Sequence, residues 1–523
     1  MNRPILRKLP IGIQSFEKLR SEGFLYVDKT ALVFQLAQAG VPCFLSRPRR
    51  FGKSLLLSTF EAYFRGKKEL FKGLAIEQLE EDWYEYPVLH LDLNAEKYDS
   101  AERLAKMLEL QLETWEAQYG VDKGNMTYSG RFTTIIKKAY EQTGRRVVVL
   151  IDEYDKPMLR SFDNPQLQED FRETLTAFYT VLKSADSYLQ FVFITGVTKF
   201  AQMGIFSTLN QLNDISFDRE YNTLCGMTRP EIEAAFAPEL QALAERSGLP
   251  QKEALDCLAR QYDGYRFTYD DTFMPMFNPF SVLSALAKQS FGNYWFASGT
   301  PTFLVEMLKR TDFDMRQMEG IEVSAASLSD DRVNMKNPVP MIYQSGYLTI
   351  KAYDKRFQIY TLGFPNEEVK YGFLNFAAPF YTPVPETDTA FYIGKFVNEL
   401  ESGNAEAFLN RLRAFFADFP YELNTKTERH YQVVFYLVFK LMGQFVEAEV
   451  RSARGRADAV VKTEHYIYVF EFKLDGSPQA ALNQINEKGY LLPFTADGRK
   501  LVKTGVAFDA EERNLGEWMI EEE

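Results

Sequence analysis

The sequence of 523 residues contains little cysteine and histidine and no long hydrophobic run. Its three cysteines, Cys43, Cys225 and Cys257, are scattered and only three histidines accompany them, so zinc-type clusters are excluded and reduced, buried thiols are expected. No apolar run approaches the roughly 18 residues that cross a bilayer, and the first residues lack the apolar segment of a signal peptide. Low-complexity tracts and internal repeats are also absent. We therefore expect a soluble, cytoplasmic, globular protein that makes no contact with a membrane.

A positive charge excess is also missing, because the formal net charge is −12. This balance excludes a protein that is coated with nucleic acid over its whole surface, since phosphate backbones need cations facing them. A local basic groove stays compatible with the composition. The length exceeds what one hydrophobic core supports, so two or three domains are expected.

A phosphate-binding pattern lies near the N-terminus, but it lacks the glycine that opens the usual motif. An apolar strand is predicted at Val41–Ser46 and a helix at Ser54–Phe64, and the segment RPRRFGKS joins them. The backbone N–H groups of such a loop, together with the start of the helix, face an anion. Lys53 would reach the β- and γ-phosphates, and the Ser54 hydroxyl would join the Mg²⁺ shell.

The same loop is rich in arginine. Arg47 stands where the opening glycine is expected, and Arg49 and Arg50 follow it, so three guanidinium groups lie near the phosphates. Alternatively, one of these arginines faces a neighbouring subunit or a nucleic acid. The candidate nucleotide-binding residues of this segment are Arg49, Arg50, Phe51, Gly52, Lys53, Ser54 and Leu55.

Acidic residues end the next strongly apolar strand. The run Arg145–Pro157 is rich in β-branched residues up to Asp152 and Glu153, as expected for a central strand of a parallel sheet that is covered on both faces. In open α/β sheets, ligands bind at the carboxyl ends of the strands. Asp152 would hold Mg²⁺ through water, and Glu153 would polarise the attacking water. A strand that merely ends in an acidic turn is the alternative.

Two more strands are predicted around this one, at Tyr86–Asn94 and Leu189–Phe200. The second carries Thr195 and Thr198 near its end, where a polar side chain can report on the γ-phosphate. We assign Thr198 to that position, with an ordinary threonine of a strand and turn as the alternative. Long helical segments between the strands have the length of parallel crossovers.

Together these segments resemble the AAA-ATPase-like family found in many bacteria. The resemblance rests on the ordered motifs YVDKTALV, FLSRPRRFGKSLLLSTF, LIDEYDKP, FITGVTKF, YDGYRF and NPFSVL, and it covers residues 5 to about 300. In that family the arginine-rich loop is itself the pattern. The resemblance implies ATP and Mg²⁺ as cofactors, and it supports nucleotide binding more directly than turnover. Within YVDKT, Asp28 and Lys29 lie either beside the base or at an exposed helix start.

The middle of the chain predicts helices and then a hairpin. Amphipathic spacing runs from about residue 227 to 308, with Thr228 as a helix cap and Pro230 in the first turn, and this resembles the helical lid that follows an AAA-type core. Further on, PMIYQSGYLTIKAYD and RFQIYTLGFPN alternate as the two strands of a hairpin. This part of the sequence suggests no chemistry.

A second constellation lies near the C-terminus, where helix and strands are predicted in the order α-β-β-β-α-β from Glu428, with KTGVAFD as the last strand. Asp458 lies early in the second strand, and Glu471 and Lys473 share one face near the end of the third. Charges that end an otherwise apolar strand cost desolvation unless they are exposed or used. The carboxylates would hold Mg²⁺, and the lysine would orient water or stabilise developing charge. The pattern predicts metal-dependent phosphodiester hydrolysis, with an ordinary charged strand surface as the alternative.

This constellation resembles the PD-(D/E)XK nuclease superfamily, and in particular the nuclease domain that is fused to the family above. The resemblance implies a further acid at Glu428, ranks Glu449 below it, and matches Gln484 and Tyr490 on the following helix. The implied catalytic residues are Glu153 in the first site and Asp458, Glu471 and Lys473 in the second. The implied metal ligands of both sites are Ser54, Asp152, Glu428, Asp458 and Glu471.

The expected fold is α/β, with a P-loop AAA-like parallel sheet and helical lid, a small α+β connector and a restriction-endonuclease-like α/β domain. The expected boundaries are 1–225 for the core, 226–308 for the lid, 309–388 for the connector and 389–523 for the nuclease-like domain. The expected function is ATP binding and hydrolysis coupled to a Mg²⁺-dependent nuclease that acts on nucleic acid, with DNA preferred. A non-catalytic ATP switch, or a binding or assembly protein with an inactive nuclease-like domain, is the alternative. A homo-oligomer is compatible with either.

Overall fold

The computed structural model divides into two compact units, one of residues 1–313 and 319–369 and one of residues 314–318 and 370–523. We describe each unit by itself. The backbone is described for residues 7–523 except 95, 200–210, 269–273, 298–303, 305–306, 309–310, 312, 329–336, 382–385, 418–427, 451–457, 474–475, 510–511, 513 and 523. Side chains are also left out at 380–381, 386–388, 390, 428–432 and 449–450.

The first unit is built on a parallel sheet of five strands in the order β2-β3-β4-β1-β5. The strands are β1 (Cys43–Ser46), β2 (Val88–Asp92), β3 (Val147–Asp152), β4 (Leu189–Gly196) and β5 (Asn213–Asp214). Because β4 lies between β1 and β3, the loop that follows β1 and the acidic end of β3 open at the same edge of the sheet. The predicted parallel α/β core is therefore confirmed.

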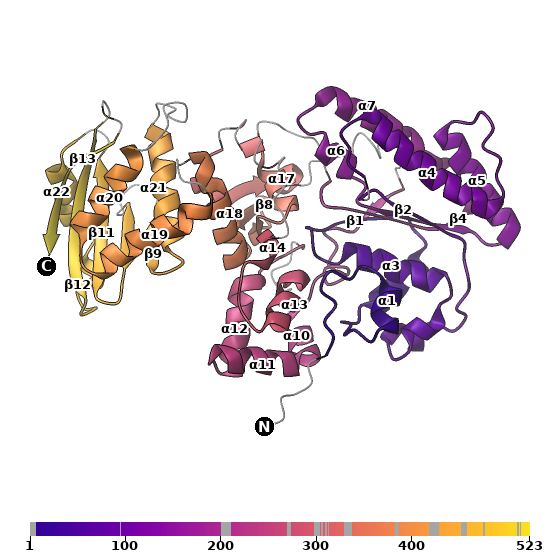
Figure 1. Ribbon diagram of the computed structural model, residues 1–523, viewed down its shortest axis with the longest axis horizontal. Helices are drawn as coiled ribbons and strands as arrows, with labels where there is room; N and C mark the ends of the chain where they lie inside the picture. The colour runs from indigo at the N-terminus through magenta and orange to yellow at the C-terminus, as the bar shows by residue number, and fades with distance from the viewer. Residues whose placement is uncertain are drawn as a thin grey trace. The chain divides into compact units, whose positions relative to one another are not determined.

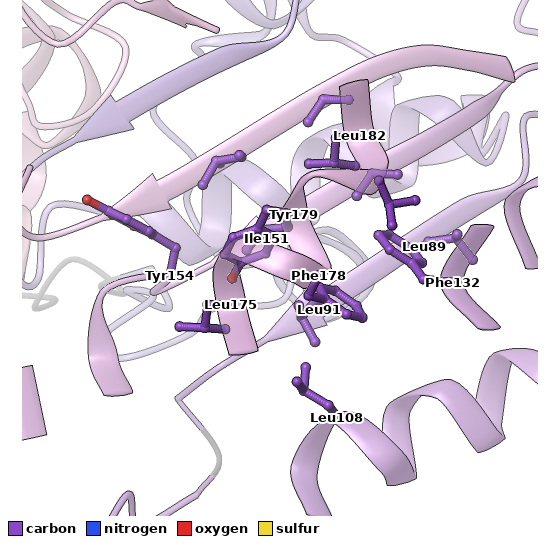
Figure 2. Packing of buried hydrophobic residues seen from close by; sticks show 14 of the residues in the cluster. Leu89, Leu91, Leu108, Phe132, Ile151, Tyr154, Leu175, Phe178, Tyr179 and Leu182 are labelled. Atoms are coloured by element: carbon purple, nitrogen blue, oxygen red, sulfur yellow. The ribbon is translucent and has the colours of Figure 1, made fainter. Parts of the chain in front are cut away.

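Helices cover both faces of this sheet (Figure 1). On one face, Phe60 and Phe64 of α3 (Lys53–Phe64) pack against Phe191 and Phe193 of β4, with ring centroids 4.8 to 5.2 Å apart. On the other face, a buried cluster joins strand residues to residues of several helices, and Figure 2 shows part of it. These helices include α4 (Ala101–Tyr119), α5 (Tyr128–Thr143) and α7 (Pro165–Tyr179).

The cluster explains why the strand segments are apolar on both sides. In β3, Val147, Val149 and Ile151 belong to this cluster, while Val148 and Leu150 are buried on the opposite face. In α4, Leu104, Leu108 and Leu112 recur at helical spacing and are buried against the sheet. The other α-helices that the structure describes before β5 are α1 (Phe16–Ser21), α2 (Thr30–Ala39), α6 (Lys156–Arg160) and α8 (Val181–Ser184).

A helical bundle follows the sheet, as the sequence predicts. Thr228 and Glu231 form a capping box at the start of its first helix, and Pro230 lies in the first turn. Ile232, Phe236, Leu243 and Leu258 lie in one buried cluster of the bundle. Its helices are α10 (Arg229–Ala235), α11 (Ala237–Ser247), α12 (Gln251–Tyr262) and α13 (Pro279–Lys288), followed by α14 (Tyr294–Ala297).

A small antiparallel sheet in the order β6-β8-β7 completes the first unit, and it differs from the predicted hairpin at its start. Residues predicted as part of the first strand form the helix α17 (Val339–Gln344). The side chain of Asn337 accepts the N–H of Val339, proline lies in the first turn, and Gly346 with φ of 89° follows the helix, so local signals outweigh the alternation. The other elements are β6 (Ile321–Ser324), α16 (Ala325–Leu328), β7 (Thr349–Asp354) and β8 (Ile359–Gly363).

The second unit contains a mixed sheet of five strands in the order β13-β12-β11-β10-β9. Among the described strand pairs of this sheet, β11 and β12 are parallel and the others are antiparallel. Helix α22 joins β11 and β12 and packs through Leu482 and Ile485 on Val469 and Leu501. On the other side of β11, Phe470 and Phe472 contact Phe435 and Phe439. The strands are β9 (Glu447–Val450), β10 (Ala459–Lys462), β11 (Tyr466–Lys473), β12 (Lys500–Asp509) and β13 (Asn514–Glu522), and the helices are α18 (Glu367–Tyr381, which begins in the first unit), α19 (Glu386–Glu401), α20 (Ala405–Ala417), α21 (Glu428–Met442) and α22 (Pro478–Glu487).

The predicted order of this unit was wrong at its end, because β13 follows the strand that was predicted as the last. β13 is an edge strand that pairs antiparallel with β12 and buries only Leu515. An edge strand that carries glutamates and exposes both faces shows little hydrophobic alternation, which explains why the pattern did not reveal it. In the part of the chain that the structure describes, no helix is long and apolar enough to cross a membrane.

Candidate functional sites

A cavity of about 500 Å³ opens in the first unit at the carboxyl edge of the parallel sheet. Residues 49–55 of the predicted phosphate loop line it, together with Glu153 after β3. Its size falls in the range of small-molecule and cofactor sites. The predicted loop residues are thus brought together in one cavity.

The loop backbone is shaped around the start of α3. Arg50 and Gly52 have positive φ angles of 67° and 93°, and Gly52 directly precedes the helix. A glycine suits the left-handed conformation here, since a side chain at this φ is strained even though space is open around it. Lys53 is buried, and its ammonium donates to the carbonyl oxygens of Arg47 at 3.0 Å and Pro48 at 3.2 Å. The loop therefore holds its lysine in place with its own carbonyls.

The three arginines of the loop have different surroundings. Arg47 is buried outside the cavity wall, donates to the carbonyls of Ser216 and Tyr221, and lies 4.2 Å from the ring of Phe267. Burial lowers the pKa of this guanidinium. Arg47 therefore ties the loop to the rest of the unit.

Arg49 and Arg50, by contrast, line the cavity. Arg49 lies 4.5 Å from the ring of Trp295, and Arg50 lies 4.8 Å from the ring of Phe280. Nε and Nη2 of Arg49 are buried and have no hydrogen-bond partner within the described residues. These two arginines, and not Arg47, are the ones that a ligand in the cavity can reach.

Acidic residues lie at the end of β3 and directly after it, and one of them, Glu153, lines the cavity. The Asp152 carboxylate accepts hydrogen bonds from the Glu153 N–H at 3.0 Å and from the Thr195 hydroxyl at 2.6 Å. Glu153 lines the cavity and has a φ of 51°, which is unusual for a residue with a side chain and marks a constrained position. Asp152 is buried just outside the wall.

Thr198, which was predicted to report on the γ-phosphate, is hydrogen-bonded to Asp155. Its N–H and hydroxyl donate to Asp155 at 2.7 and 2.8 Å, and the N–H of Val197 donates to the same carboxylate. Thr198 lies outside the cavity wall, whereas Asp155 is part of it. Burial raises the pKa of Asp155, and a side chain at Gly196 would collide with it, so glycine is required there.

Sequence reasoning missed three polar residues of this wall, namely Asp155, Lys156 and Asn94. The Lys156 ammonium bonds to Asn94 Oδ1 at 2.9 Å and to Glu153 Oε2 at 3.2 Å, so it links the ends of β2 and β3. Asp155 and Lys156 stand in the quoted run LIDEYDKP, and their polar character directly after an apolar strand was the available signal. Asn94 gave no such signal in the sequence, because its place in the wall depends on β2 and β3 being neighbours.

Part of the cavity lining is apolar. Leu25, Tyr26 and Val27 line it from one side, and Met227 and Phe236 line it from the helical bundle. Lys29 also lines the cavity and forms an ion pair with Glu231 of α10. Beside an anionic group bound at the loop, this part of the lining suits a flat apolar group.

The second constellation lies in the second unit, at the ends of β10 and β11. Asp458 directly precedes β10 rather than lying within it, and its carboxylate accepts the N–H of Phe472 at 2.9 Å. Burial raises the pKa of Glu471 to about 7, and the neighbouring Asp458 carboxylate adds to the rise. Burial also raises the pKa of Asp458. The two carboxyl groups therefore lie close together in a poorly solvated place.

Lys473 and Gln484 complete this cluster. The Lys473 ammonium lies 3.2 Å from Glu471 Oε1 and also donates to the Gln484 side chain, whose amide donates to Glu471 and to the Tyr490 hydroxyl at 3.2 Å. Glu471 Oε2 is buried and has no partner within the described residues. The predicted Asp458, Glu471 and Lys473 are thus brought together, with Gln484 and Tyr490 beside them.

Two other predicted acids are not placed in this cluster. Glu428 begins α21 and Glu449 lies in β9, and both side chains fall outside the described ones. Within the described side chains, no group of three or more His, Cys, Asp or Glu could hold a metal ion. The pair of carboxylates with one unpaired oxygen still fits a hard cation such as Mg²⁺, which often keeps most of its waters and takes one or two carboxylates.

Comparisons with known proteins match both regions. Residues 10–206 match the family model described as predicted AAA-ATPase, and residues 426–518 match that of the PD-(D/E)XK nuclease superfamily. A relative from Azotobacter chroococcum mcd 1, described as an uncharacterized protein in the vnfD 5′ region, is 34% identical over 526 residues. The match covers 98% of this chain and 99% of the relative.

Among solved structures, the chain is similar to the ORC2 protein of Aeropyrum pernix in its ADPNP–ADP complexes. The match covers 70% of this chain and 92% of that chain, at 11% identity and a TM-score of 0.24. A likeness this low supports no argument about fold or function.

Proposed function

Because this chain belongs to the AAA-ATPase-like family and carries a C-terminal domain of the PD-(D/E)XK nuclease superfamily, we propose that it binds ATP with Mg²⁺ in its first unit and cleaves DNA with a divalent metal in its second. The observation that supports the nucleotide site is the cavity where residues 49–55 face the acidic end of β3. The observation that supports the nuclease site is the cluster of Asp458, Glu471 and Lys473.

In the first unit, each loop residue has a role that its position allows. The N–H groups at the start of α3 and the Lys53 ammonium bind the β- and γ-phosphates. The Ser54 hydroxyl would join the shell of a hydrated Mg²⁺, Asp152 would reach that shell through water from just outside the cavity wall, and Glu153 would orient the attacking water. Thr198 acts through Asp155, whose carboxylate it fixes with two hydrogen bonds.

Binding of a fluorescent ATP analogue to wild type and to Lys53→Ala tests this half. Loss of the charge-assisted contacts is expected to weaken binding about a hundredfold. Lys72→Ala, which removes an exposed lysine from the same unit, serves as the matched control and is expected to bind like wild type. Equal binding by Lys53→Ala and wild type would exclude the cavity as the nucleotide site.

In the second unit, Asp458 and Glu471 are the proposed metal ligands, and Glu471 offers the unpaired Oε2. A bound divalent cation supplies a polarised phosphoryl oxygen and a water of lowered pKa. Lys473 holds the attacking water or stabilises the charge that develops on the phosphate. Gln484 fixes the positions of the Lys473 and Glu471 side chains through one hydrogen bond to each.

Cleavage of plasmid DNA in Mg²⁺ or Mn²⁺ tests this half. Wild type is expected to nick the plasmid, and Asp458→Ala and Lys473→Ala are expected to abolish nicking while the protein still binds nucleotide. If wild type and both variants are equally inert on DNA and on RNA, with and without ATP, the nuclease proposal fails and the nucleotide proposal survives.

One observation favours a second candidate function. In the cluster, the Lys473 ammonium already bonds to Glu471 and to Gln484, so these side chains are held together without a bound metal. An ATP-dependent binding or assembly protein, with a nuclease-like domain that has lost turnover, would retain this arrangement. Nucleotide binding that depends on Lys53, together with inert wild type in the plasmid assay, would support this candidate.

A further inference from the structure

A buried tryptophan connects the phosphate loop to another part of the first unit. The indole N–H of Trp295 donates to the carbonyl of Arg49 at 3.2 Å, and its ring lies 4.5 Å from the Arg49 guanidinium. Trp295 is fully buried on the short helix α14, which is 246 positions away in sequence. One side chain thus contacts both the backbone and the charge of Arg49.

The Arg49 guanidinium can interact either with the ring of Trp295 or with an anion in the cavity. Its Nε and Nη2 are buried without a hydrogen bond within the described residues, and the ring of Trp295 lies against its charge. Burial lowers the pKa of this group, which shows the cost of keeping the charge there. Phosphate is a stronger partner for a guanidinium than an indole ring, since the two form charge-assisted hydrogen bonds. An anion in the cavity therefore competes with Trp295 for Arg49.

On its other side, Trp295 is held by a buried acid. The backbone N–H of Trp295 donates to Glu368 Oε1 at 2.7 Å, and the Ser281 hydroxyl donates to Glu368 Oε2 at 2.7 Å. Glu368 is 1% exposed, and burial raises its pKa to about 7. The mechanism proposed above does not use this acid, yet it costs free energy to keep it buried.

Glu368 lies in the first turn of α18, and this turn is anchored to the helical bundle at further points. Asn366 caps the helix by accepting the N–H of Val369 and donates to the carbonyl of Asp263 at 2.7 Å. The Gln261 amide donates to Glu367 at 2.9 Å. The first residues of α18 belong to the first unit and the helix continues into the second from residue 370. A change at this turn therefore acts on the start of the segment that leads to the nuclease-like domain.

We propose that Trp295 and Glu368 relay the occupancy of the nucleotide cavity to the first turn of α18. The inference rests on the proposed nucleotide binding and does not require nuclease activity. When phosphate draws Arg49 away from the indole, Trp295 loses a partner and holds Glu368 less firmly. A ligand shifts such an equilibrium only through contacts that differ between the two states, and Arg49 supplies that difference.

Hydrogen exchange of the intact chain, with and without saturating ADP and Mg²⁺, tests the relay. In wild type, ADP is expected to speed the exchange of amides in residues 367–375 about fivefold, a modest coupling. Trp295→Phe keeps an aromatic ring that is a weaker cation partner than an indole, so it is expected to reduce the ADP effect. Glu368→Leu loses the acceptor for Trp295 and is expected to abolish the effect. Glu368→Gln retains an acceptor and is expected to keep it.

Ser281→Ala is the matched control, because it removes a hydrogen bond to Glu368 but leaves the bond to Trp295 intact, and it is expected to respond to ADP like wild type. Saturation is checked by titration for every variant. Unchanged exchange in ADP-saturated wild type, or a full response in both Trp295→Phe and Glu368→Leu, overturns the relay. If wild type shows no saturable ADP binding, the proposed nucleotide function fails first and the relay falls with it.

Discussion

The two candidate sites are opposite in charge. The nucleotide cavity gathers Arg49, Arg50 and Lys53 at a loop and a helix start, whereas the nuclease-like cluster buries two neighbouring carboxyl groups. In each site one charged group lacks part of its hydrogen bonding within the described residues, namely Nε and Nη2 of Arg49 and Oε2 of Glu471. Buried polar atoms without partners are costly, so we expect each site to bind a ligand of the opposite sign. Within each site, the unpaired group favours a ligand of one charge, which a short motif alone does not indicate.

The two sites also differ in how their lysines are held. Lys53 donates to carbonyls of its own loop and is paired with no carboxylate in the described contacts, while Lys473 is paired with Glu471. A lysine held by neutral carbonyls is available to an anion. A lysine paired with a metal-binding carboxylate competes with the cation for it.

The largest effect is expected from a substitution of Lys473, which tests whether its pairing with Glu471 separates cleavage from metal binding. Lys473→Met is expected to slow cleavage about a thousandfold, because the water or the developing charge loses its partner. The affinity for Mn²⁺ is expected to stay equal or rise, because Glu471 is released from its ion pair. Parallel measurements of the cleavage rate and of Mn²⁺ binding check both. Lys462→Met, which removes a lysine paired with Glu447 on the same sheet, is the control.

A metal affinity that falls together with the cleavage rate in Lys473→Met would contradict this division of roles. It would mean that the lysine supports the fold of the cluster and not the chemistry.

The next prediction concerns the pH dependence of stability and a buried acid, Glu368, whose two carboxyl oxygens both accept hydrogen bonds. Glu368, like Glu471, has its pKa raised by burial to about 7, but its two oxygens accept bonds from Trp295 and Ser281. The folded protein retains this proton at a pH where the unfolded chain releases it. The stability that the protonated group provides is therefore complete below about pH 4.5 and declines as the pH rises to about 7.

Glu368→Gln removes this titration. Relative to wild type, the variant is expected to gain about 2 to 3 kcal/mol of stability between about pH 5 and about pH 8. Denaturant unfolding at the two pH values, followed for the first transition of the intact chain, measures the gain. A difference between variant and wild type that is the same at both pH values would show that Glu368 is already ionised in the folded protein.

The smallest effects are expected on ADP affinity, and they rank Arg49 and Arg50 by their contributions to binding. Arg49→Ala is expected to weaken ADP binding about tenfold, since a buried guanidinium contributes more than an exposed one. Arg50→Ala is expected to weaken it about threefold, because its side chain is exposed and its charge is screened. Titrations with ADP at two salt concentrations check the ranking. An Arg50→Ala effect larger than that of Arg49→Ala would reverse the assignment of the phosphate-facing arginine.

The parts of both sites that depend on local sequence could be predicted. Lys53 and Ser54 follow a strand and begin a helix, and Asp152 and Glu153 end a fully apolar run, so their placement at the sheet edge followed from short-range pattern. Asp458, Glu471 and Lys473 were found in the same way, because charge at the end of an apolar strand is unusual. The parallel sheet followed from the apolar strands and the crossover helices between them.

Other features depend on neighbours that are distant in sequence. The contact of Lys156 with Asn94 requires β2 beside β3, and the contact of Trp295 with Arg49 joins residues 246 positions apart. The different surroundings of Arg47, Arg49 and Arg50 were invisible, because three arginines in one loop look alike until the packing of Phe267, Trp295 and Phe280 is known. Edge strand β13 was missed because it buries a single residue.

The most direct test of two sites with opposite charge is calorimetric titration of the intact chain with ADP–Mg²⁺ and, separately, with Mn²⁺ in the absence of nucleotide. Lys53→Ala is expected to lose ADP binding and to retain Mn²⁺ binding, whereas Asp458→Asn is expected to lose Mn²⁺ binding and to retain ADP binding. Wild type is expected to bind both. Loss of both ligands in either variant, or of neither ligand in both variants, would contradict the account.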